Sequence, residues 1–108
     1  MLQVRNLISR RSGNAIANQF VIETTERTWF QSYESLCALV EWDAGTKQLN
    51  VTLGPDWDYS RAILKYLIQF LEEYSPFAPK NAAEVRKMIK DGLIKECDYE
   101  SQLERRTA

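Results

Sequence analysis

The chain has 108 residues and a formal net charge of −1, with 14 lysine and arginine residues, 15 aspartate and glutamate residues, and no histidine. This length suits a single domain with one hydrophobic core. The balanced charge argues against a duplex nucleic-acid binder, which usually carries a basic excess. Apolar runs such as Cys37-Ala38-Leu39-Val40 are far shorter than the roughly 18 residues that span a bilayer. The N-terminus shows no signal-peptide pattern, so we expect a soluble, cytoplasmic protein without membrane contact.

Alternating apolar and polar residues predict a meander of about four antiparallel strands with one solvated face. Residues 2–8 are compatible with a short edge strand that precedes them. The four strands are expected at 17–24, 28–33, 36–42 and 47–53. In the third of these, the residues expected to share one face are Leu36, Ala38, Val40 and Trp42.

The register of the first hairpin decides which side chains face the core, because a slip of one residue exchanges the two faces of a strand. A three-residue loop at 25–27 pairs Ile22 with Phe30, whereas a two-residue loop pairs Ile22 with Trp29. We expect the three-residue loop. It places Phe20, Ile22 and Phe30 in the core.

The second half of the chain predicts two helices and a tail. A long helix is expected at 58–74, where Asp58 or Ser60 can cap the first turn and seven large apolar side chains fall on one face. A shorter helix is expected at 81–91, opened by the capping-box spacing of Asn81 and Glu84. Residues 98–108 are polar and predict a flexible C-terminal tail. We therefore predict one α+β domain over 1–97, in which the long C-terminal helix covers the sheet and the second, short helix follows it.

The sequence offers no set of groups suited to catalysis or to holding a cofactor or metal. Histidine, the side chain most used for acid–base catalysis and metal binding, is absent. Cys37 and Cys97 are far apart in the sequence, and the four glycines are not gathered in a phosphate-binding loop. The best-placed carboxylates, Asp56 and Asp58, are expected to cap a helix. We expect a protein that is not an enzyme and uses no cofactor or metal.

Trp29, Gln31 and Tyr33 are the candidate binding residues, because the expected register turns them to the solvent side of the sheet. Exposed aromatic residues supply much of the energy at protein interfaces. Two rings on a sheet can also stack unpaired bases, with Arg27 and Lys47 as phosphate contacts. Aromatic residues on strands also serve in core or cross-strand packing, and this alternative stays open.

Four short segments follow one another at a recognisable spacing. They are Asn18-Gln19-Phe20-Val21-Ile22, Phe30-Gln31-Ser32-Tyr33-Glu34-Ser35, Trp57-Asp58-Tyr59-Ser60, and Lys65-Tyr66 followed by Phe70-Leu71. In this order, over residues 14–71, they resemble a family of small uncharacterised proteins of bacteriophages and related mobile elements. The chain departs from that pattern at Arg61-Ala62, where the family tends to have paired threonines. No activity is attached to the family.

The resemblance implies a small accessory protein, encoded by a phage or mobile element and acting in a bacterial cell. We expect it to bind a macromolecule rather than to catalyse a reaction. A protein partner is favoured, and inhibition of a host defence protein is one specific form of this function. The alternative is a single-stranded nucleic acid held on the aromatic face of the sheet.

Overall fold

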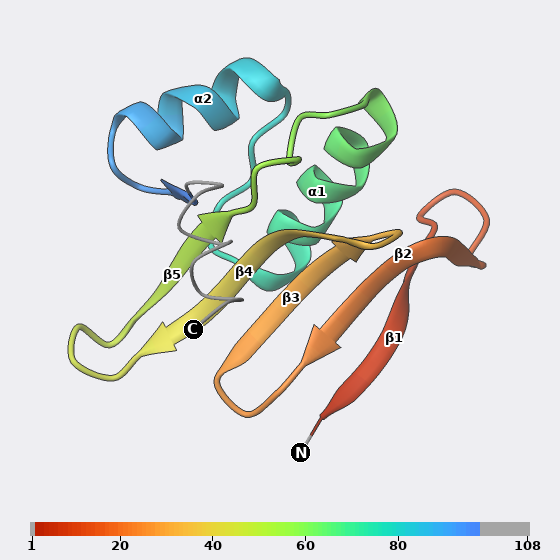
Figure 1. The fold of residues 1–108 in the computed structure, drawn as a ribbon, viewed down its shortest axis with the longest axis horizontal. Coiled ribbons are helices and arrows are strands. Elements are labelled where there is room, and N and C mark those ends of the chain that lie inside the picture. The colour runs from red at the N-terminus through yellow and green to blue at the C-terminus, as the bar shows by residue number, and fades with distance from the viewer. Residues whose placement is uncertain (1, 98–108) are drawn as a thin grey trace.

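The computed structural model describes residues 2–97, so the tail predicted at 98–108 lies outside the described residues. The described elements are β1 (Gln3–Ile8), β2 (Ala15–Glu23), β3 (Arg27–Ser32), β4 (Ser35–Asp43), β5 (Gln48–Leu53), α1 (Arg61–Tyr74), α2 (Ala82–Lys90) and β6 (Lys95–Glu96). All six strands form one sheet, in the order β1-β2-β3-β4-β5-β6 (Figure 1). Neighbouring strands are antiparallel except for β5 and β6, which are parallel. The predicted α+β class is confirmed.

The predicted number of strands is too low, because the described part of the sheet has six strands rather than about four. The segment compatible with an edge strand does form β1. β6 was not predicted, because it has only two residues and is too short to show alternation. β6 reaches the sheet only after the chain has passed through both helices, so its pairing with β5 depends on the tertiary fold.

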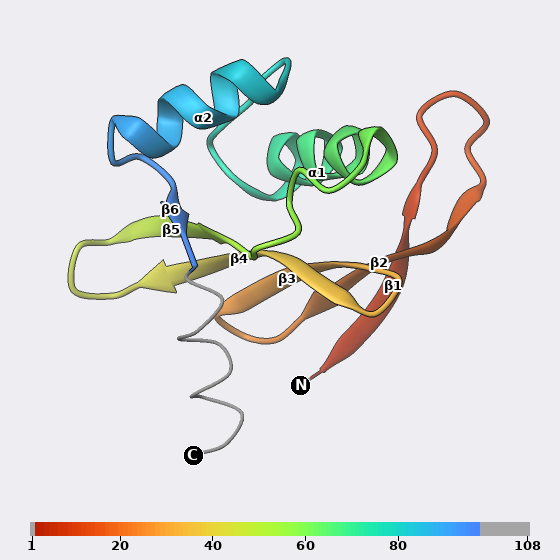
Figure 2. The ribbon, with the colours of Figure 1, turned by 45° about the horizontal axis from the view of Figure 1, so that its top comes forward.

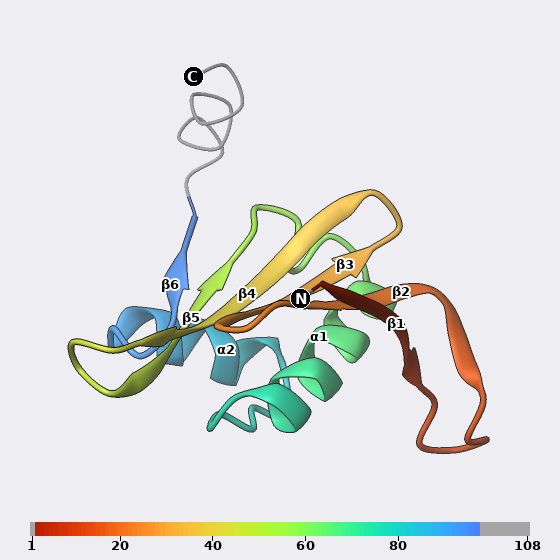
Figure 3. The same cartoon turned by 90° about the horizontal axis from the view of Figure 1, so that it is seen from below.

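Both helices lie against one face of the sheet, which gives the molecule two layers (Figure 2). The view from below shows the same arrangement, with α1 and α2 on the same side of the strands (Figure 3). The prediction that one long C-terminal helix covers the sheet is wrong, because α2 contributes the fully buried Val85 to the same core. A short helix is therefore part of the covering layer as well.

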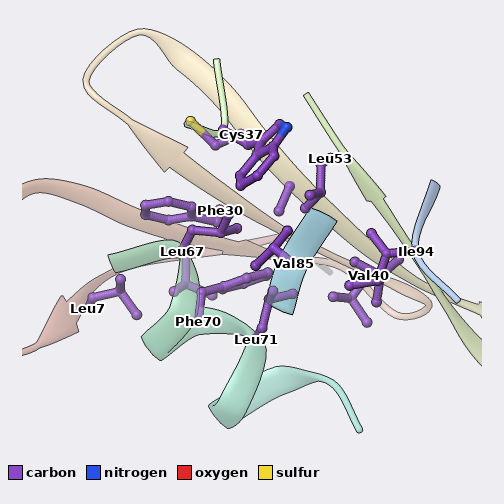
Figure 4. Close-up of a cluster of buried hydrophobic side chains, with 14 residues drawn as sticks. Leu7, Phe30, Cys37, Val40, Leu53, Leu67, Phe70, Leu71, Val85 and Ile94 are labelled. Carbon is purple, nitrogen blue, oxygen red and sulfur yellow. The ribbon is translucent and has the colours of Figure 1, made fainter. Parts of the chain in front are cut away.

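The core lies between the two layers and is centred on aromatic rings (Figure 4). Phe30 of β3 stacks on Phe70 of α1 with ring centroids 5.6 Å apart, and Phe70 stacks on Tyr74 at 5.2 Å. Leu67 and Leu71 of α1 are also fully buried. Burying one such side chain stabilises the fold by about 1.5–3 kcal/mol. The apolar stripe of α1 therefore holds the helix on the sheet.

The ends of the helices follow from hydrogen bonds that cap them. α1 begins at Arg61 rather than at residue 58, because the hydroxyl of Ser60 accepts a hydrogen bond of 3.1 Å from the amide of Ile63. α2 begins after Asn81, whose side-chain oxygen accepts a hydrogen bond of 2.9 Å from the amide of Glu84. The predicted cap at Asn81 is confirmed.

The expected register of the β2–β3 hairpin is wrong. Ile22 pairs with Trp29, and Val21 pairs with Phe30. The amide of Thr24 donates a hydrogen bond of 2.8 Å to the carbonyl oxygen of Arg27, which closes the two-residue loop. The slip of one residue brings Val21 into the core. It moves Phe20 and Ile22, which were both expected in the core, to the other face.

Candidate binding surface

The face of β1–β5 turned away from the helices, here called the open face, carries a row of apolar side chains. Phe30 points into the core, so its neighbour Trp29 points to the open face. The cross-strand pairs then extend from Trp29 to Ile22 and Val4 on one side and to Leu39 on the other. We call these four residues the apolar row. Directly opposed side chains in such pairs lie close enough to pack on one another.

The apolar row is more exposed toward the edge of the sheet. Val4 on β1 is 59% exposed, whereas Ile22, Trp29 and Leu39 are half-buried. Because both described helices lie on the other face, the partial burial of these three residues is consistent with packing on their neighbours along the sheet. The row is thus a contiguous apolar surface centred on a tryptophan.

A bulge in β4 adds Leu36 to the open face. Phe30 pairs with Ala38 and Gln31 pairs with Leu36, which leaves Cys37 as an extra residue in β4. The prediction that Leu36 shares a face with Ala38 is therefore wrong, since the bulge reverses the direction of the strand's side chains. Gln31 also pairs with Phe20, so Gln31 lies between two apolar residues of the open face.

A hollow of about 170 Å³ lies beside Trp29. Its lining includes Leu36, Leu39 and Gly54. A Cβ atom at Gly54 would come within 2.1 Å of the carbonyl oxygen of Leu36, so this position requires glycine. The close approach is fixed by a hydrogen bond of 2.8 Å from the amide of Gly54 to the carbonyl oxygen of Cys37. The open face therefore has a depression next to its tryptophan.

Tyr33 does not continue the strand that carries Trp29 and Gln31. β3 ends at Ser32, and Tyr33 lies in the turn to β4 with a φ of 54° and 62% of its surface exposed. The side-chain amide of Gln31 donates a hydrogen bond of 2.6 Å to the carbonyl oxygen of Tyr33. Of the three candidate residues, Trp29 and Gln31 thus share the open face, and Tyr33 stands at its end.

The two basic side chains proposed as phosphate contacts, Arg27 and Lys47, do not lie together around Trp29. Arg27 lies on the open face but forms an ion pair with Glu41, with 3.3 Å between Nε and Oε2. Lys47 lies in the turn before β5, with a φ of 57°. The apolar row is therefore bordered by a neutral pair of opposite charges at Arg27 and Glu41.

Two polar residues are buried on the helix side of the sheet. Gln19 and Ser32 are cross-strand partners and are almost fully buried. The side-chain oxygens of both find no hydrogen-bond partner among the described residues. Gln19 was expected on the surface, and the corrected register of β2 places it in the core layer with Val21 instead.

The reactive side chains of the described residues are held in structural contacts. Burial raises the pKa of the Cys37 thiol to about 11, so the thiol stays protonated near neutral pH. The prediction that Asp56 and Asp58 cap a helix is wrong, because Ser60 caps α1. Asp56 instead accepts a hydrogen bond of 3.1 Å from the Ser35 hydroxyl, and Asp58 pairs with Arg86 at 3.4 Å. Among residues 2–97, no three cysteine, aspartate or glutamate side chains lie together in a way that could hold a metal ion.

No helix in the described part of the chain has the length and apolar character needed to cross a membrane. Comparison of the chain with protein-family models, with curated proteins and with solved structures finds no match in any of the three.

Proposed function

We propose that this protein is a non-enzymatic binding module that holds a protein partner on the open face of its sheet. The observation that carries this proposal is the apolar row of Val4, Ile22, Trp29 and Leu39, which lies on the side of the sheet opposite the described helices. Contiguous exposed apolar surface on a small domain marks an interaction site.

The composition of the open face supports a protein as the partner. Protein interfaces combine an apolar centre containing large aromatic residues with a polar rim. Here Trp29 lies at the centre beside its hollow, and the Arg27–Glu41 ion pair lies at the border. An aliphatic or aromatic side chain of the partner would enter the hollow, and the rim would fix its orientation.

The biological setting of the proposal rests on the resemblance carried by the four short sequence segments. It points to an accessory protein of a bacteriophage or mobile element, acting in the cytoplasm of a bacterial cell. In that setting the partner is a bacterial or phage protein, and a component of host defence is one candidate. The lack of histidine in the chain supports binding over catalysis.

A capture experiment with two tryptophan variants tests the proposal. The immobilised protein is incubated with bacterial lysate, with and without nuclease, and the recovered proteins are compared for the native chain, Trp29→Ala and Trp42→Ala. Trp42 is the matched control, because it is 43% exposed but shares its face with the core residue Val40, on the helix side of the sheet.

We expect the native chain and Trp42→Ala to recover the same protein after nuclease treatment, and Trp29→Ala to lose it. Equal recovery by both variants would show that the open face is not the binding surface. Loss of the recovered material on nuclease treatment would favour the alternative function, the binding of single-stranded nucleic acid.

A further inference from the structure

Two adjoining hollows run along the solvent side of α1. One, of about 270 Å³, is bordered by Arg10 and Arg11 of the β1–β2 loop. The other, of about 350 Å³, is bordered by Arg61 and Lys80. Both are lined by Lys65 and Ile68 of α1, so the hollows meet at this turn of the helix. We call the combined depression the α1 groove. Figure 2 shows the β1–β2 loop rising on the same side of the sheet as α1.

The α1 groove carries an excess of positive charge. Its exposed cations that form no ion pair with a described residue are Arg11, Arg61, Lys65 and Lys80. The fifth cation, Arg10, is paired with Glu72 and Glu73. Among the described residues that line the two hollows, Glu72 is the only one with a carboxylate. This local excess contrasts with the net charge of −1 of the whole chain.

The lining of the α1 groove also includes half-buried aliphatic side chains. Leu64 and Ile68 are four positions apart on α1 and therefore lie on one face of the helix. Ile16 of β2 adds a third aliphatic residue in the adjoining hollow. The groove thus presents an apolar floor between separate cations, an arrangement that accepts a ligand carrying both aliphatic groups and carboxylates.

We propose that the α1 groove binds an acidic segment of a protein, whose aliphatic side chains lie on Leu64 and Ile68 and whose carboxylates contact Arg61, Lys65 and Lys80. The complementary charges of such a segment speed and orient its association. This surface is separate from the open face, since α1 lies on the opposite side of the sheet. The proposal is therefore independent of the function proposed above.

The lining of the groove favours a peptide over a nucleic acid. Single-stranded nucleic acids are held by aromatic rings that stack on bases and by a basic track along the backbone. Among the described residues that line the groove, Tyr66 is the one aromatic residue. It is half-buried and has the ammonium group of Lys65 5.5 Å from its ring centre.

The test uses a fluorescein-labelled synthetic peptide of aspartate and leucine in alternation. A length of about eight residues spans the 14-residue helix when the peptide is extended. Fluorescence anisotropy measures its binding to the full chain at about 50 mM and about 300 mM salt, because screening weakens contacts between exposed charges. Two further probes are a peptide with serine in place of leucine and a thymidine oligonucleotide of the same charge.

Two charge-reversal variants provide the matched pair. Lys65→Glu/Lys80→Glu alters the groove, and Lys87→Glu/Lys90→Glu makes the same change of charge on α2 outside it. We expect the first variant to weaken peptide binding roughly tenfold or more and the second to weaken it much less. We also expect the serine peptide and the oligonucleotide to bind more weakly than the aspartate–leucine peptide.

Three results would overturn the proposal: no binding of the peptide at low salt, equal weakening by both variants, or tighter binding of the oligonucleotide. Amide chemical shifts of the native chain, recorded during a titration with the peptide, give a readout that needs no variant. Shifts centred on Lys65, Ile68 and Lys80 support the groove, and shifts centred on β2 and β3 assign the peptide to the open face instead.

Discussion

The backbone amide of Tyr33 donates a hydrogen bond of 2.7 Å to the carbonyl oxygen of Asn18, and both residues have positive φ angles, of 54° and 64°. The bond joins the β3–β4 turn to the irregular part of β2, where the pairing with β1 shifts between Phe20 and Ala15. A left-handed backbone costs about 1–2 kcal/mol at an ordinary residue, and asparagine tolerates it better than most. The strain at Tyr33 is therefore held in place by the surrounding strands.

Substitutions at Tyr33 test this strain. We expect Tyr33→Asn to leave the free energy of unfolding unchanged or to raise it by up to about 1 kcal/mol, because asparagine adopts the left-handed conformation more readily. We expect Tyr33→Val to lower it by at least about 1 kcal/mol, because a β-branched side chain adopts that conformation poorly. Urea denaturation measures both. Equal stability of the two variants would show that the turn relaxes to another conformation.

Phe70 tests the packing of α1 on the sheet. Its side chain is fully buried between Phe30 and Tyr74, so Phe70→Ala should lower the free energy of unfolding by about 3–5 kcal/mol. Leu67→Ala should cost about 2–5 kcal/mol for the same reason. Leu93, which is 54% exposed, is the control, and Leu93→Ala should change stability by roughly 0.5 kcal/mol or less. A loss at Phe70 no larger than that at Leu93 would contradict the buried position of the helix.

The buried thiol of Cys37 makes stability depend on alkaline pH. Its pKa is raised to about 11 in the folded chain, whereas an exposed cysteine titrates near pH 8.5. Above the pKa of the unfolded chain, the unfolded state loses this proton and the folded state keeps it, so stability falls as pH rises toward 11. The contribution is fully present below about pH 8.

Comparison with Cys37→Ala isolates this contribution from the lysines and tyrosines that titrate in the same range. Chemical denaturation between about pH 7 and pH 10.5 should show a steeper loss of stability for the native chain than for the variant. Parallel curves would mean that the thiol is solvated in the folded state. Reaction with iodoacetamide gives a second measure, since Cys37 should be alkylated only when the chain unfolds.

Much of the fold could be predicted because its local signals agree with its packing. The alternation at Val51 and Leu53 marks the buried face of β5, and the apolar stripe of α1 marks the side that meets the sheet. The side-chain caps at Ser60 and Asn81 lie at the ends of the helices because they satisfy amides that have no partner within the helix. Each of these features depends on residues close together in the sequence.

The errors concern features that only the assembled sheet determines. The turn at Thr25-Glu26 contains none of the glycine or asparagine residues that identify two-residue hairpin loops. Val21 and Ile22 of β2 are adjacent and both apolar, although they point to opposite faces of the sheet. The apolar pattern of β2 is therefore compatible with either register. The bulge at Cys37 is not visible in the sequence, because β4 keeps an apolar residue at every second position from Leu36 to Trp42. Leu36 and Ala38 nevertheless point to opposite faces of the sheet.

The candidate surface was predicted in part, because the orientation of β3 was correct although the orientation of β2 was not. Phe30 faces the core in both the predicted and the observed register, which turns Trp29 and Gln31 outward in each case. The correction matters on the neighbouring strand. It moves Ile22, which the predicted register had placed in the core, beside Trp29 and so creates the apolar row.

The adjacent residues Trp29 and Phe30 give the most direct test of the open face, because they point to opposite sides of one strand. Phe30→Ala should lower the free energy of unfolding by about 3–5 kcal/mol, as expected for a fully buried ring. The double variant Trp29→Ala/Tyr33→Ala should lower it by only about 1–2 kcal/mol, since Trp29 loses cross-strand contacts with Ile22 and Leu39 while Tyr33 is largely exposed.

The same double variant should stay folded and lose the captured protein, because aromatic residues at the centre of an interface carry a large share of its binding energy. Circular dichroism and urea denaturation establish the fold, and recovery from lysate establishes binding. If the double variant unfolds as readily as Phe30→Ala, Trp29 belongs to the core and the open face has no separate role. If it stays folded and recovers the same protein as the native chain, the binding surface lies elsewhere on the molecule, and the α1 groove becomes the next surface to alter.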